Sequence, residues 1–294
     1  ERIDSKSAWK SGAAIVIHPI TLAASPRADI FPDAGTDAAG RVWVAWQSFR
    51  NGYSDIYVRS CEPGSAEWGK EIQVTKDHGG NWEPRLAFAA DGPAVALDSS
   101  KGGTFNVYLA RIAADGTVKI AQVSSSPRYE GRSSIATAAD GKGFWLAWES
   151  GREKWGGDTR GVNGNVGLNA DKQARVAYVD AASGKVTEAA DPTPAVMAMP
   201  APHALAEADD HDHDRCSECG EIPGAVSVMA DVKPKAKTKA DAKAKQPKAK
   251  AAKAPAKEKV TAVNLPKIAV DAQGSPWLAI RYCTTAKYWR IALM

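Results

Sequence analysis

Residues 40–59 read GRVWVAWQSFRNGYSDIYVR. Apolar and polar residues alternate in both halves of this stretch, and the alternation breaks once, at Asn51-Gly52. A period of two is typical of a β-strand, and an Asn-Gly pair between two such runs is typical of a tight turn. The stretch therefore predicts two consecutive antiparallel strands.

The same pattern recurs three more times along the chain. The copies are DGPAVALDSSKGGTFNVYLARI from Asp91, DGKGFWLAWES from Asp140 and AQGSPWLAIRY from Ala272. The turn glycines Gly40, Gly92 and Gly141 fall about 50 residues apart, and repeats of this length with four strands each are the signature of a β-propeller. A β-sandwich of irregular strands is the alternative, but it would not explain the period.

Each copy contains further strands on both sides of the quoted pattern. A first strand precedes it, as FPDAGTDA, EPRLAFAA, GRSSIATAA and LPKIAVDA. A third strand follows as DIYVRS, NVYLARI, RVAYVD and YWRIAL, and a fourth as KEIQVTK, VKIAQVS and GKVTEAA. The sequence therefore predicts an all-β fold, a β-propeller with about four recognisable four-stranded blades.

The ends of the chain and its composition divide it into three parts. Residues 14–32 resemble residues 70–84, so the chain is expected to begin on the fourth strand of an otherwise missing blade. An N-terminal strand could also complete the last blade, but a ring of four blades would be unusually small, so we expect part of a larger propeller. The predicted division is blades over 1–188, a low-complexity insertion over 189–262 and an incomplete last blade over 263–294.

Composition limits the classes of partner. The net charge is +4, but residues 233–259 hold 11 lysines against Asp241 and Glu258, which leaves −5 for the rest of the chain. The propeller therefore has no general basic face for nucleic acid. No apolar run is long enough for a transmembrane segment, and no signal segment opens the chain. Four cysteines are too few for a disulfide scaffold.

Several motifs resemble known propeller families. SFRNGYSDIYVR is similar to the repeats of TolB-like propellers, and TKDHGGNW at residues 75–82 resembles the Asp-box turn of sialidase-like propellers, with Asn81 where Thr is usual. That turn is structural, and no triad of sialidase arginines can be assigned, so sialidase activity is not carried over. NWEPRLAFAADG, WLAWESGREKWGGD and LPKIAVDAQGSPWLA together resemble the propeller region of an uncharacterised group of secreted bacterial proteins. Those proteins also carry a metal-dependent hydrolase-like domain, which these residues do not contain, and the resemblance implies export to the periplasm or the cell exterior.

Two insertions mark the expected binding face. Residues 151–173 and the long insertion both emerge on the face that commonly binds ligands in propellers. At its mouth the motif Trp46-Gln47-Ser48-Phe49-Arg50 recurs as Trp148-Glu149-Ser150-Gly151-Arg152. A guanidinium beside an indole suits an anionic or glycan ligand, and Trp155 and Asp158 are the next candidates. In the alternative interpretation Arg50 and Arg152 pair with neighbouring acids, such as Glu149 or Asp158, and tie loops together.

The long insertion holds a candidate metal site. His211, His213, Cys216 and Cys219 are the ligand types that zinc prefers. These residues are nearly adjacent, however, whereas structural zinc sites usually join two separated pairs, so an exposed loop or a Cys216–Cys219 disulfide stays open. Such a zinc site would be closed, and therefore structural or scavenging rather than catalytic.

The sequence contains no nucleophile elbow, phosphate-binding glycine loop or His-Glu-x-x-His motif. We therefore expect a non-catalytic ligand- or protein-binding region of a larger exported bacterial protein. One alternative is a propeller hydrolase acting on a glycan-like substrate. Another is an interaction scaffold whose Lys-rich loop binds an anionic surface.

Overall fold

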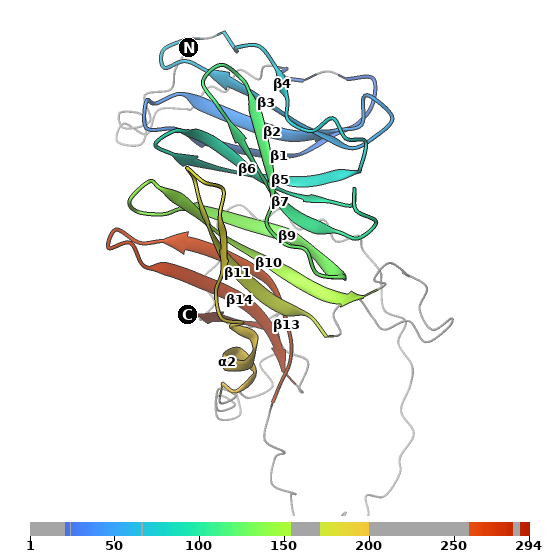
Figure 1. Cartoon of the computed structure of the whole chain (residues 1–294), viewed down its shortest axis with the longest axis vertical. Helices are drawn as coiled ribbons and strands as arrows, with labels where there is room; N and C mark the ends of the chain where they lie inside the picture. Colours follow the sequence, from blue (N-terminus) through green and yellow to red (C-terminus); the bar gives the residue numbers. More distant parts are fainter. Residues whose placement is uncertain (1–20, 24, 66, 154–170, 200–258, 285–288) are drawn as a thin grey trace, which may run out of the picture. The chain divides into compact units, whose positions relative to one another are not determined.

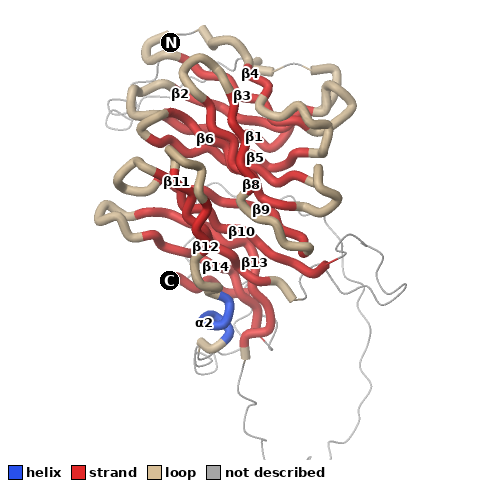
Figure 2. Tube along the Cα trace, viewed as in Figure 1, coloured by secondary structure: helices blue, strands red, loops and turns tan. Residues whose placement is uncertain are grey.

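A computed structural model of the chain describes residues 21–23, 25–65, 67–153, 171–199, 259–284 and 289–294. These residues form four antiparallel sheets that follow one another along the chain, with almost no helix (Figures 1 and 2). The predicted β-propeller fold is confirmed, and we call the four sheets blades 1 to 4.

The four blades share one strand order. Blade 1 is built from β1 (Asp29–Thr36), β2 (Val42–Ser48), β3 (Asp55–Cys61) and β4 (Ile72–Gln73), and blade 2 from β5 (Asn81–Ala89), β6 (Gly92–Ser99), β7 (Asn106–Ile112) and β8 (Val118–Gln122). Blade 3 contains β9 (Arg128–Thr137), β10 (Gly143–Glu153), β11 (Gln173–Asp180) and β12 (Val186–Glu188). Blade 4 has three strands, β13 (Val260–Val270), β14 (Pro276–Thr284) and β15 (Trp289–Leu293).

The chain between blades 3 and 4 is described in part. Residues 189–199 of the predicted insertion contain the short helix α2 (Thr193–Met197), whose Val196 packs in the apolar cluster shared by blades 3 and 4. The predicted last blade begins at residue 263, whereas β13 begins at Val260. Within the described residues, no helix is long and apolar enough to cross a membrane.

Successive blades pack through the two faces of their strands. In blade 1 we define a forward row, formed by Trp43, Ala45, Ile56 and Val58. In blade 2 we define a rear row, formed by Val95, Leu97, Tyr108 and Ala110. The two rows lie in one core cluster. Equivalent clusters join blade 2 to blade 3 and blade 3 to blade 4. Because blades 2 and 3 bury both faces, both sides of their strands must be apolar, which explains the apolar residues on the two sides of β6 and β10.

Side chains at one repeated position hydrogen-bond the next blade. Gln47 of β2, Asp98 of β6 and Glu149 of β10 are all buried. Gln47 accepts the main-chain N–H of Glu83, Asp98 that of Arg132 and Glu149 that of Leu265. These three donors lie at β-bulges, and their backbones have positive φ angles of 47°, 55° and 47°, a conformation that is rare outside glycine. The buried polar side chains therefore hold the bulges of neighbouring blades in place.

Candidate functional site

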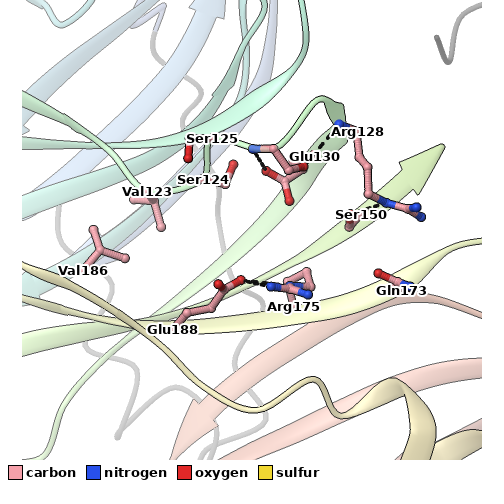
Figure 3. A pocket seen from close by; sticks show the side chains of 11 residues that line it. Val123, Ser124, Ser125, Arg128, Glu130, Ser150, Gln173, Arg175, Val186 and Glu188 are labelled. Carbon is pink, nitrogen blue, oxygen red and sulfur yellow. Dashed lines mark hydrogen bonds and ion pairs between the residues drawn. The ribbon is translucent and has the colours of Figure 1, made fainter. Parts of the chain in front are cut away.

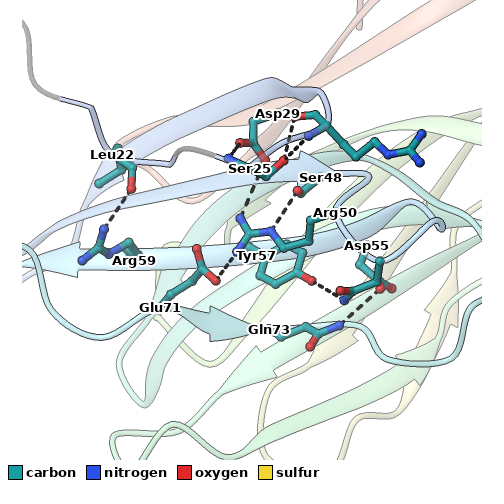
Figure 4. Close-up of polar contacts among 12 residues, drawn as sticks. Leu22, Ser25, Asp29, Ser48, Arg50, Asp55, Tyr57, Arg59, Glu71 and Gln73 are labelled. Carbon is teal, nitrogen blue, oxygen red and sulfur yellow. Dashed lines mark hydrogen bonds and ion pairs between the residues drawn. The ribbon is translucent and has the colours of Figure 1, made fainter.

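Arg50 lies inside a polar cluster at the end of β2 (Figure 4). Its guanidinium donates to Ser48 Oγ at 3.0 Å and to Glu71 Oε1 at 2.6 Å. Asp29 Oδ1 is 3.7 Å away, and the guanidinium carbon lies 4.1 Å from the centre of the Tyr57 ring. Burial opposes ionisation of Asp29, but hydrogen bonds from Ser48 and the Ser25 N–H, with the charge of Arg50, outweigh it and lower its pKa. Arg50 is therefore occupied by contacts within blade 1.

The two tryptophans of the predicted motif lie in the protein interior. Trp46 is 3% exposed and stacks on Tyr57, with ring centres 6.0 Å apart. Trp148 is 1% exposed and belongs to the core between blades 2 and 3. Neither indole presents a ring to a ligand in this structure.

The other predicted residues divide between the described and undescribed parts of the chain. The Arg152 side chain is half exposed, and its Nε lies 3.4 Å from Asp171 Oδ2. Trp155, Asp158 and the predicted zinc ligands His211, His213, Cys216 and Cys219 lie outside the described residues. Within the described residues, no group of three or more His, Cys, Asp or Glu side chains is placed to hold a metal ion.

A cleft of about 370 Å³ opens between blades 2 and 3, where β10 ends and β11 begins (Figure 3). The segment after β8, residues 123–126, forms one wall, and β9 to β12 form the other. Hydroxyl, amide, guanidinium and carboxylate groups predominate among the lining residues, with two valines. The residues are Val123, Ser124, Ser125, Ser126, Arg128, Glu130, Ser150, Gln173, Arg175, Val186 and Glu188.

The charges in this cleft compensate one another. Arg175 donates from Nε and Nη2 to Glu188 Oε1. Arg128 donates to Ser150 Oγ at 3.0 Å and to the Asp171 carbonyl at 2.8 Å. Arg175 occupies in blade 3 the register position of Tyr57 in blade 1, since both lie opposite the tryptophan of the second strand. The cleft thus offers donors and acceptors without a net positive field.

A second cluster of polar side chains surrounds Asp98 of β6. Burial raises the pKa of Asp98 to about 7, with Glu83 adding to the shift and the N–H groups of Arg132 and Ser133 opposing it. Burial also raises the pKa of Tyr129, and the negative charges of Asp98 and Glu149 act in the same direction. The buried Lys172 donates to Glu149 Oε2 at 2.6 Å. Every buried carboxylate named here is hydrogen-bonded to the protein itself.

Sequence reasoning missed Asp98 and the cleft residues Arg128, Glu130 and Arg175. Gln47, Asp98 and Glu149 lie 51 residues apart, so aligning the repeats position by position would have shown that one polar side chain recurs inside an apolar strand. No sequence signal marks the cleft, because its walls come from two blades.

No protein-family model matches the chain. No curated protein matches it either. Among solved structures it is similar to TolB from Agrobacterium tumefaciens, at 17% identity and a TM-score of 0.33 over 51% of this chain and 45% of that one. It is also similar to a xylan β-1,4-xylosidase from Bacillus halodurans C-125, at 9% identity and a TM-score of 0.41 over 92% of this chain and 41% of that one. A GH43 endo-arabinanase from Bacillus licheniformis gives 16% identity and a TM-score of 0.29, over 53% of this chain and 55% of that one.

The chain spans about half the length, or less, of the solved structures it matches. Likeness in fold alone does not assign a function. The residues that bear on function are those of the cleft and those around Asp98.

Proposed function

We propose that this chain is a non-catalytic binding region of an exported β-propeller protein, and that a small polar ligand of glycan-like chemistry occupies the cleft between blades 2 and 3. The observation that carries the proposal is the cleft itself. Its volume of about 370 Å³ lies within the range of small-molecule pockets, roughly 300–1,000 Å³. Export follows the resemblance of the repeats to secreted propeller proteins.

The chemistry of the lining favours a neutral ligand rich in hydroxyl groups. An anion would have to displace Glu188 from Arg175, and a cation would have to displace Arg175 from Glu188. A sugar hydroxyl both donates and accepts, so it can bind beside an intact ion pair and hydrogen-bond the exposed Ser125 and the half-buried Gln173. This complementarity supports a glycan-like ligand over a phosphate or a polyamine.

Titration calorimetry with a panel of neutral oligosaccharides tests the proposal. The Arg175→Gln variant should weaken binding at least tenfold, because it removes the ion pair and part of one wall. Arg111→Gln is the matched control, since the Arg111–Asp91 pair has nearly the same side-chain exposure, 26% and 47% against 29% and 49%, at the opposite ends of the strands. Equal affinities of the two variants, or no binding by the parent protein, would contradict the cleft assignment.

A hydrolase acting on glycans is the second candidate, and the raised pKa of Asp98 favours it. A carboxyl group that titrates near 7 can act as a general acid at neutral pH. Against this role, Asp98 accepts the Arg132 N–H just as the amide of Gln47 accepts the Glu83 N–H. This hydrogen bond does not require a group that can be protonated. Release of reducing ends from the same oligosaccharides, lost in Asp98→Asn, would favour the hydrolase.

A further inference from the structure

Blades 1 to 3 carry a basic side chain at one repeated position, three residues after the buried polar residue that contacts the next blade. These side chains are Arg50, Lys101 and Arg152. In blade 1 the Arg50 guanidinium carbon lies 4.1 Å from the centre of the Tyr57 ring. In blade 2 Lys101 Nζ lies 4.0 Å from the centre of the Tyr108 ring. A cation over the face of an aromatic ring is a favourable contact, so blades 1 and 2 share a cation–tyrosine pair.

In blade 3 an arginine replaces the tyrosine of this pair. Tyr108 of β7 and Arg175 of β11 hold the same register position in their blades, and Arg175 offers no ring face to a cation. The Arg152 side chain is half exposed, with its Nε 3.4 Å from Asp171 Oδ2. The same carboxylate oxygen lies 3.6 Å from Nη2 of Arg128, which lines the cleft. Among the residues that the structure describes, Arg152 therefore stands beside the cleft without the ring that its two counterparts cover.

The cleft corresponds to the space that the Tyr108 ring fills between blades 1 and 2. Tyr108 is 4% exposed and shares one apolar cluster with Val74 and Val118. Val123 follows β8 as Val74 follows β4. Val186 begins β12 as Val118 begins β8, and both Val123 and Val186 line the cleft half-buried. The junction between blades 2 and 3 therefore keeps the apolar surroundings of the ring but not the ring itself.

We propose that an aromatic ring of the ligand occupies this space, so that the cleft binds a neutral aryl glycoside. The sugar part hydrogen-bonds Ser125 and Gln173. The ring lies against the two valines of the cleft, where the guanidinium groups of Arg152 and Arg175 stack on it. This inference rests on the function proposed above and adds a second chemical group to the ligand.

Stacking on a ring is compatible with the ion pairs that these two arginines make. A guanidinium contacts a ring through its plane and a carboxylate through its edge. Arg175 can therefore keep its contact with Glu188, and Arg152 its contact with Asp171, while a ring is bound. A positively charged ring would be repelled by both guanidinium groups, and a negatively charged one would compete with the two carboxylates. The charges around the cleft therefore favour a neutral ring.

Titration calorimetry with paired phenyl and methyl β-glycosides of glucose, galactose and mannose tests the inference, since each pair differs only in the ring. The parent protein should bind the phenyl member of its preferred pair about tenfold more tightly. Arg152→Gln should lower this preference. Arg175→Tyr should remove it, because the new side chain fills the space as Tyr108 does in blade 2. Lys101→Gln changes the equivalent cation of blade 2 and is the matched control, which should leave the preference unchanged.

The outcomes separate this inference from the function on which it rests. Equal affinities of the parent protein for the phenyl and methyl glycosides would overturn the aromatic subsite and leave the glycan-binding proposal intact. Failure to bind any glycoside of the set, together with failure to bind the neutral oligosaccharides, would overturn both. A preference for phenyl that neither Arg152→Gln nor Arg175→Tyr changes would place the ring outside the cleft and would also refute the inference.

Discussion

Polar residues at one equivalent position of the repeat make the same hydrogen bond but differ in chemistry. Gln47, Asp98 and Glu149 each accept a bulge N–H from the next blade, and burial raises the pKa of Asp98 to about 7. The neutral Gln47 shows that charge is not required for this hydrogen bond. The effect of Asp98 protonation on the stability of the protein can therefore be measured.

We predict that Asp98→Asn flattens the pH dependence of the free energy of unfolding. The Asp98 pKa is raised from 3.8 to about 7, so between these values the folded state binds more protons than the unfolded state. Stability should therefore fall as the pH rises through this window, by up to roughly 1.4 kcal/mol per pH unit. Urea unfolding of both proteins at several pH values from 4 to 8 measures the slope.

The carboxyl groups with lowered pKa values titrate below the pH window in which Asp98 titrates. Asp29, Asp37 and Asp77 titrate below the ordinary value of 3.8, so their contribution to stability is lost only in more acidic solution. An unchanged slope in Asp98→Asn would show that Asp98 is ionised throughout the window.

At the scale of the strands, hydroxyl groups join the fourth segment of a blade to its third strand. Thr75 Oγ1 accepts the Ile56 N–H at 2.9 Å and donates to Asp55 Oδ1 at 2.9 Å, in a buried site. Thr75→Val keeps the side-chain shape, leaves the buried Ile56 N–H without its acceptor and removes one of the hydrogen bonds to Asp55, so it should destabilise the protein by about 1–3 kcal/mol. Thr187→Val, on the exposed strand β12, is the control and should change stability by less than about 0.5 kcal/mol. Chemical denaturation of the two variants gives the comparison.

The strands were predictable because alternation and turn residues repeat with a fixed period. Even the short strand β12 (Val186–Glu188) falls where the repeat places it, in GKVTEAA. The roles of individual residues were harder to predict. Trp46 and Arg50 are neighbours in a motif, yet the indole faces the protein interior and the guanidinium pairs with Glu71, 21 residues away. When both rows of a strand are apolar, alternation shows that they oppose each other but not which neighbour covers each.

At the scale of the whole molecule, three core clusters join the four blades, so each blade is stabilised by its neighbours. The bulges of the first strands determine which mutations this fold tolerates there. At Glu83, Arg132 and Leu265 the neighbouring blade holds the main-chain N–H, so the backbone shape does not depend on which side chain is present. Phe31 has the same positive φ angle in β1. The four blades accordingly carry an aromatic, an acidic, a basic and an aliphatic residue at one structural position. Mutation can alter the chemistry at this position, one blade at a time, while the framework that supports it stays the same.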